Sequence, residues 1–170
     1  MKHTLLFLFM SYGVVLFGQQ ITVKTAFLEK WENSKSYLLT IAEAMPEELY
    51  DFRPTERQMT FKEQLVHMKS NMDWLSLTYF TQETFDRSNI PLPETKAATI
   101  TLLTEAFENT ATLIQNTSEA DFEAVVDFFS GPKSKLQILN LLQDHVSHHR
   151  GQLIVYLNLN NIAPPPYVGW

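Results

Sequence analysis

The chain has 170 residues, 45% of them hydrophobic and 19% charged, with a formal net charge of −6, and it contains no cysteine. This length and balance are typical of a single globular domain with a sizeable core rather than a disordered chain. The acidic charge and the lack of a Lys/Arg cluster argue against a nucleic-acid partner, and the absence of cysteine excludes disulfides, thiolate metal sites and a cysteine nucleophile.

The first residues, MKHTLLFLFMSYGVVLFGQQ, carry Lys2 and then an apolar run from Leu5 to Phe17. This run is short for a bilayer span but suits the apolar region of a secretory signal. We therefore predict a signal peptide over residues 1–18, a domain over residues 19–170, and an exported protein, periplasmic or secreted. An uncleaved anchor and a cytoplasmic first helix are the alternatives.

Four long segments follow in which apolar residues recur at helical spacing, and none shows sustained strand alternation. The first is expected at about 22–44 and is closed by Pro46. The second begins at Thr60, where Thr60 and Glu63 form a capping-box pattern, and its apolar seam runs to Tyr79. The third and fourth are expected at about 97–116 and 134–161. Long connections between four amphipathic helices predict an all-α bundle with at least one overhand crossover.

The tail NNIAPPPYVGW cannot be helical after Pro164, because consecutive prolines impose an extended path. We expect its apolar residues Tyr167, Val168 and Trp170 to fold back over one end of the bundle. Packing is the expected role of these side chains.

The segment LLQDHVSHHRGQLIVYL of the fourth helix holds three of the five histidines. On a helical wheel of about 100° per residue, His145 and His149 take the apolar seam positions that follow Leu142. Burial of an imidazole without a partner costs about 1–3 kcal/mol, so these side chains need partners. Their spacing of one turn lets both rings converge on one metal ion.

His148 points about 100° away from His149, so it could replace one ligand but not join both on the same ion. In the predicted bundle the one candidate for a third ligand is His67, at the edge of the apolar stripe of the second helix, beside Gln64 and Asn71. His3 lies in the predicted signal. Each histidine could instead be a hydrogen-bonded core or boundary side chain, so the spacing leaves both interpretations open.

Three segments together, PEELYDFRPTERQMTFKEQLVHM, DHVSHHRGQL and PPPYVGW, resemble the DinB/YfiT-like family of metal-binding four-helix bundles over about residues 22–170. The resemblance implies an up-down-down-up bundle with long connections, in which His67, His145 and His149 hold a divalent ion. It also implies that His148 is not a ligand and that Arg150, Gly151 and Gln152 support the site. Many relatives are dimers, so a homodimer is expected, and the characterised ones are thiol-dependent transferases or isomerases.

Three histidines suit zinc or nickel, with iron or manganese as alternatives. Such an ion keeps coordination positions open and lowers the pKa of a thiol or water that binds it. The expected function is therefore a metal-dependent thiol S-transferase acting on a small-molecule substrate with a low-molecular-weight thiol. A metal-dependent hydrolase and a non-catalytic exported bundle that binds a metal or ligand are the alternatives.

Two features of the sequence argue against a thiol transferase. Export would remove the protein from most intracellular thiols, and no acidic residue accompanies the histidines as a general base, because Asp144 projects about 100° away from His145. No catalytic residue is therefore assigned.

The sequence also lacks an H-E-x-x-H motif and E-x-x-H pairs, which argues against a zincin protease and a carboxylate-bridged di-iron bundle.

Overall fold

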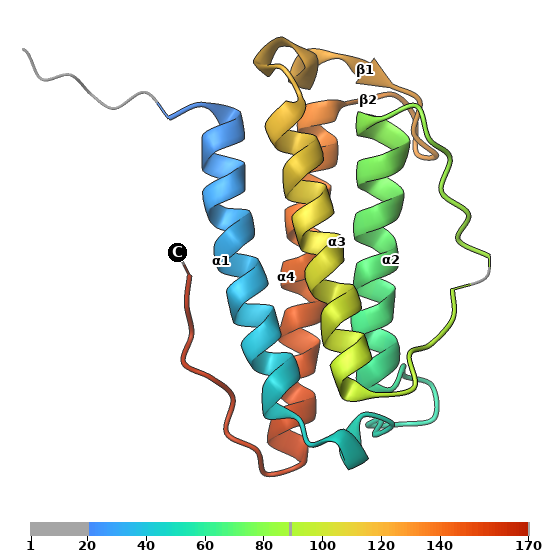
Figure 1. The fold of residues 1–170 in the computed structure, drawn as a ribbon, viewed down its shortest axis with the longest axis vertical. Coiled ribbons are helices and arrows are strands. Elements are labelled where there is room, and N and C mark those ends of the chain that lie inside the picture. The colour runs from blue at the N-terminus through green and yellow to red at the C-terminus, as the bar shows by residue number, and fades with distance from the viewer. Residues whose placement is uncertain (1–20, 89, 170) are drawn as a thin grey trace, which may run out of the picture.

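The computed structural model describes residues 21–88 and 90–169, and these form a bundle of four long helices (Figure 1). The helices are α1 (Val23–Ala44), α2 (Phe61–Phe80), α3 (Lys96–Asn116) and α4 (Lys135–Leu159). The predicted four-helix bundle is thus confirmed. The predicted signal peptide over residues 1–18 lies outside the described residues. Among the helices described, none combines the length and apolar character needed to cross a membrane.

Hydrogen-bonded caps fix the start of the two helices that carry the histidines. At α2 the Glu63 backbone N–H donates to the Thr60 hydroxyl (3.1 Å), and the Thr60 N–H donates to the Glu63 carboxylate (2.6 Å). At α4, Ser134 and Gln137 form the same reciprocal pair. Each box satisfies two backbone N–H donors that a helix start otherwise leaves free.

The core lies between the helices, where α2 packs against α3 and α4 and α1 packs against the same two helices. Trp31 is 1% exposed, packs on Phe27 and Phe107, and donates its indole N–H to the Phe107 carbonyl (3.0 Å). Burying one such large side chain stabilises the fold by about 1.5–3 kcal/mol. This core keeps α2 and α4 side by side, which brings His67 toward the histidines of α4.

Short elements occupy the connections between the long helices. One-turn helices lie at η1 (Glu47–Leu49) and η2 (Glu119–Glu123). Strands β1 (Val125–Val126) and β2 (Lys133–Ser134) form an antiparallel pair that the sequence did not predict. Two residues per strand are too few for an alternating pattern to be visible. Residues 81–88 and 90–95 contain no helix or strand, and they belong to the connection between the end of α2 and the start of α3, which lie at opposite ends of the bundle (Figure 1).

The C-terminal tail runs along the side of α1, and not over a bundle end as expected (Figure 1). The Tyr167 ring packs edge-on against Tyr37 at 6.3 Å, and Lys30 donates a hydrogen bond to the Gly169 carbonyl. The physical reason is the extended path of the prolines, which advances about 3.1 Å per residue and carries the chain along the helix. Trp170 lies outside the described residues.

Candidate metal centre

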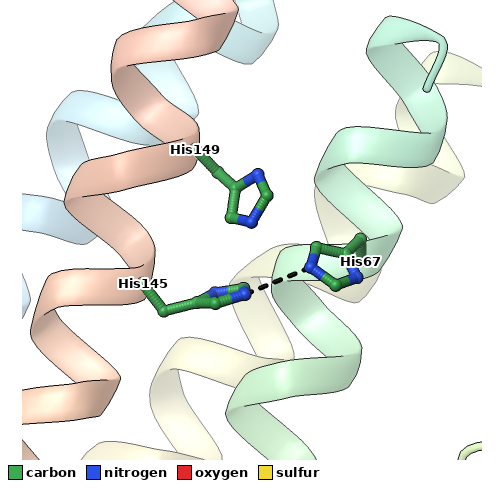
Figure 2. A group of neighbouring side chains, drawn as sticks. All are labelled: His67, His145 and His149. Carbon is green, nitrogen blue, oxygen red and sulfur yellow. Dashed lines mark hydrogen bonds between the residues drawn. The ribbon is translucent and has the colours of Figure 1, made fainter. Parts of the chain in front are cut away.

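The structure brings the three predicted histidines together from two helices (Figure 2). His67 projects from α2, and His145 and His149 project from successive turns of α4. Their ring centroids are 5.0 Å apart for His67 and His145, 4.7 Å for His67 and His149, and 4.4 Å for His145 and His149. One nitrogen from each ring lies within 4.8 Å of the others, so the three can converge on one ion.

The closest approach in this group joins two ring nitrogens. Nε2 of His145 lies 3.1 Å from Nε2 of His67, which is hydrogen-bonding distance when one of the two carries a proton. Neither nitrogen points toward a carboxylate: no Asp or Glu of residues 21–88 and 90–169 belongs to this group of donor atoms. A site made of these three side chains would therefore be all-histidine.

A hydrogen-bonded chain leads from His149 to the protein surface. Nδ1 of His149 lies 2.6 Å from Oε1 of Gln64, which can only accept, so Nδ1 carries the proton and Nε2 keeps its lone pair. The Gln64 amide nitrogen donates to Gln152 (2.7 Å), and the Gln152 amide nitrogen contacts Nε2 of His148 (2.9 Å). The chain fixes the tautomer of His149, as outer contacts commonly do for metal-binding histidines.

Burial keeps the three imidazoles neutral. It is the main cause that lowers the pKa of His145 to about 3 and that of His149 to about 4, and it also lowers the pKa of His67. The charges of neighbouring histidines add to the effect at all three, and that of Arg87 adds to it at His67 and His145. Because only a neutral imidazole has a lone pair for a metal, these rings are ready to bind at neutral pH.

Three neighbouring residues of the motif take other positions. His148 is exposed and contacts Gln152 rather than the group, as the wheel and the resemblance predicted. Asp144 is exposed and does not belong to the group, in line with its expected direction. Arg150 is 8% exposed, and its guanidinium lies 4.9 Å from the centre of the Tyr37 ring. It therefore links α4 to α1, a structural role.

An open hollow of about 460 Å³ reaches the site from the side of His67. Its lining combines the segment that precedes α2, two residues of α2 and one of the segment 81–95: Arg53, Glu56, Arg57, Gln58, Met59, Glu63, His67 and Leu92. Sequence reasoning missed the residues from the two connecting segments, because a connection without helical or strand periodicity gives no sign of where it packs. The hollow gives a small molecule access to one of the predicted ligands.

The arrangement fits a divalent first-row metal. Three neutral nitrogen donors suit zinc, nickel and iron, and the Nδ1–H of His149 has its acceptor already in place. Nδ1 of His145, by contrast, is buried without a hydrogen-bond partner in the described part of the chain. The ring of His145 is therefore held by its packing and by the rings that it faces.

The sequence profile of the DinB family matches residues 19–167. A search of curated proteins finds no match. Two similar solved structures are DinB-like proteins: one from Bacillus cereus, with a TM-score of 0.73, 17% identity and coverage of 84% of this chain and 95% of that chain; and one from Bacillus subtilis, with a TM-score of 0.68, 17% identity and coverage of 84% and 96%. At this identity the likeness shows a common fold.

Proposed function

Because the chain belongs to the DinB family, with residues 19–167 matched, and brings three histidines together, we propose that it binds a divalent metal ion and acts as a metal-dependent thiol S-transferase. His67, His145 and His149 are the proposed ligands. Zinc and nickel are the proposed metals, since both accept an all-nitrogen donor set.

The observation that carries the proposal is the combination of an all-histidine group with an open hollow beside His67. Structural metal sites are closed by four protein ligands, whereas a set of three ligands leaves room for an exogenous molecule. When bound there, a divalent ion lowers the pKa of a thiol or water that it contacts. The hollow supplies the space in which such a molecule can approach.

The side chains of this protein have defined tasks in such a reaction. His67, His145 and His149 would hold the metal ion, and Gln64 fixes the ring of His149 through its side-chain oxygen. Arg53 and Arg57 line the hollow and offer positive charge to an incoming molecule. Because no carboxylate belongs to the histidine group within the described chain, the residues favour a nucleophile that loses its proton without a neighbouring base. A thiol, with an ordinary pKa near 8.5, does so more readily than water.

The first test is elemental analysis of protein purified without a nickel affinity step. Zinc- or nickel-loaded protein is then incubated with several low-molecular-weight thiols and a chromogenic electrophile. We expect thiol conjugation to be accelerated by the wild type and by His148→Ala, and not by His145→Ala. Equal rates with and without protein, at full metal occupancy, would contradict transferase activity.

The second candidate is a non-catalytic bundle that binds a metal or a ligand. It is favoured by the absence of an acidic general base from the histidine group in the described residues. High metal occupancy with no change in the absorption spectrum of the nickel-loaded protein on addition of thiols would support this candidate, because it indicates that no coordination position exchanges. Hydrolysis of esters that is lost with chelator and restored with metal would instead assign a hydrolase.

Export and self-association are further proposals. The apolar run from Leu5 to Phe17 supports export, and the N-terminal sequence of protein recovered from the producing cell tests it, with cleavage after Gly18 expected. A homodimer is supported by the family resemblance alone. Light scattering across a range of concentrations tests it, and a constant monomer mass would contradict it.

A further inference from the structure

Aromatic side chains form a surface around Trp74, which follows His67 along α2. Trp74 of α2 stacks with Phe128 (5.9 Å between ring centroids) and with Phe129 (6.3 Å), which belong to the turn between β1 and β2. The Phe129 ring is 83% exposed, although it contacts Phe128 at 4.4 Å. Arg87 of the segment 81–95 places its guanidinium 4.2 Å from the centre of the Trp74 ring.

This surface is within reach of the metal-binding residues. Trp74 follows His67 by about two helical turns, so the two side chains lie on the same side of α2, about 10 Å apart along its axis. The guanidinium of Arg87 lies 4.2 Å from the centre of the Trp74 ring, which places this charge beside the same helix that carries His67.

We propose that Arg87, Trp74 and Phe129 form a binding subsite for an organic carboxylate, in which Arg87 binds the carboxylate and the two rings contact the adjoining apolar part of the ligand. The inference deepens the proposed function and rests on it in one respect: the reacting group of the same ligand is placed at the three histidines. The subsite would select acidic substrates over neutral ones.

The chemistry of Arg87 supports a carboxylate. A guanidinium stacked on an aromatic ring keeps the edge of its plane, and so its N–H donors, free for a planar two-oxygen acceptor. No carboxylate of the described residues lies within ion-pairing distance of Arg87. Asp86, its neighbour in sequence, accepts a hydrogen bond from the Ser88 backbone N–H at 2.8 Å. The charge of Arg87 is therefore available to an exogenous anion.

The exposure of Phe129 supports an apolar contact next to that charge. Phe129 is 83% exposed, whereas its neighbour Phe128 is 7% exposed and belongs to the core. The two side chains therefore connect the core to the exposed aromatic surface. Covering an exposed aromatic ring with an apolar ligand group removes that surface from water, which favours binding. An aromatic carboxylate would satisfy both features at once.

A purely structural role for the Arg87–Trp74 stack predicts different behaviour. In that case the stack would only hold the segment 81–95 against α2, and binding would be insensitive to ligand charge. The discriminating measurement is therefore the ratio of affinities for an acid and its amide, since the two have nearly the same shape. A folding defect in a variant lowers the affinity for both ligands by the same factor and leaves the ratio of the two affinities unchanged.

Phenylacetate and phenylacetamide are the probes, titrated into metal-free protein and followed by tryptophan fluorescence. A carboxylate can also coordinate zinc, and the metal-free arm removes that contribution. The Trp74→Phe variant identifies the signal of Trp74, because it leaves the other two tryptophans of the sequence, Trp31 and Trp170, in place. In a second arm, zinc-loaded protein is titrated with para-mercaptomethyl phenylacetate and with its amide, with zinc occupancy measured in the same samples.

We expect the acid to bind roughly tenfold more tightly than the amide in both arms, the effect of a charge-assisted, two-point hydrogen bond at an exposed site. Arg87→Met should remove the preference, and Arg87→Lys should retain a smaller one, because Lys keeps the charge without the planar fork. Lys62→Met is the control: it removes a positive charge of α2 that pairs with Asp51 (3.1 Å), outside both the hollow and the proposed subsite, and it should leave the preference unchanged.

Three outcomes would overturn the inference. They are equal affinity for acid and amide, a preference that survives Arg87→Met, and a preference that is lost in Lys62→Met instead. Self-association that is abolished by Phe129→Ala, with no binding of either probe, would assign the aromatic surface to a second copy and would also overturn it. Failure of zinc to bind contradicts the proposed function and leaves the metal-free arm as the test of the subsite.

Discussion

Oε1 of Gln64 lies 2.6 Å from Nδ1 of His149, and this contact joins α2 to α4 one turn away from His67. The same amide donates to Gln152 (2.7 Å) and, at 3.4 Å, to the hydroxyl of Tyr156. Gln64 is 4% exposed, and its bonds to His149 and Tyr156 are buried. The orientation of one predicted ligand is therefore set by a residue of the helix that supplies another.

Replacement of Gln64 by Leu should weaken metal binding by about 10–100-fold, the usual effect of removing an outer hydrogen bond from a metal-binding histidine. The proton of His149 Nδ1 would lose its acceptor, and the ring could turn away from the other two. Affinity is measured by competition with a chromogenic chelator. Gln152→Leu is the control, because Gln152 lies one hydrogen bond further from His149. A loss of metal affinity as large as that of Gln64→Leu would contradict the proposed order of these hydrogen bonds.

Substitution within the histidine group should change both metal content and stability. His145→Ala should lose the bound ion, whereas His148→Ala, which alters an exposed side chain of the same helix, should keep it. Metal in 100-fold excess over its dissociation constant stabilises a protein by about 2.7 kcal/mol. Urea unfolding with and without chelator should show this difference in the wild type and in His148→Ala only. An equal effect of chelator on His145→Ala would exclude that residue as a ligand.

The stability of the metal-free protein should fall below about pH 6.5 because of the buried histidines. In the unfolded chain their pKa is near 6.5, but in the folded chain it is lowered to about 3 for His145 and about 4 for His149. Between these values the unfolded state binds protons that the folded state does not. The contribution of the neutral histidines to the free energy of unfolding is therefore fully present above pH 6.5 and is lost as the pH falls toward 4.

Urea midpoints measured at steps between pH 7 and pH 4 test this pH dependence. Carboxylates also contribute to acid unfolding, so the comparison is with a His145→Gln/His149→Gln variant, whose midpoint should change less with pH. Parallel curves for the two proteins would mean that the histidines are not buried in their neutral form.

Thr60→Ala should destabilise the protein by about 1 kcal/mol, because the Thr60 hydroxyl accepts a hydrogen bond from the Glu63 backbone N–H at the start of α2. Thr60→Ser keeps the hydroxyl and should cost less than half as much. Chemical unfolding of the three proteins gives the comparison. Since Gln64 and His67 lie in the next turn of the helix, metal affinity in Thr60→Ala tests whether the cap also steadies the site.

The helices could be predicted because their signals are local. Apolar spacing located all four, and the capping-box pattern of Thr60 and Glu63 placed the start of α2 at the correct residue. The path of the tail beside α1 was predicted wrongly, because an extended segment follows whichever surface its start points to. The strand pair of residues 125–126 and 133–134 was missed because it is too short to leave a pattern.

The candidate site was predictable only in part. The spacing of His145 and His149 follows from helix geometry, but their meeting with His67 depends on which helices are neighbours, and the family resemblance supplied that expectation. The contact of Gln64 with His149 depends on side-chain rotamers across two helices. Arg87 lies in a segment without periodicity, so its stack on Trp74 left no trace in the sequence pattern.

Residues 81–88 and 90–95 connect α2 to α3 and form no helix or strand of the bundle. They contribute Leu92 to the hollow beside His67 and Arg87 to the aromatic surface around Trp74. The helices hold the chain together, while this strip of irregular chain borders the approaches to the histidines. Exchanging it for the equivalent strip of another bundle should therefore transfer ligand preference while the scaffold stays intact, which makes it a natural place for new specificities to evolve.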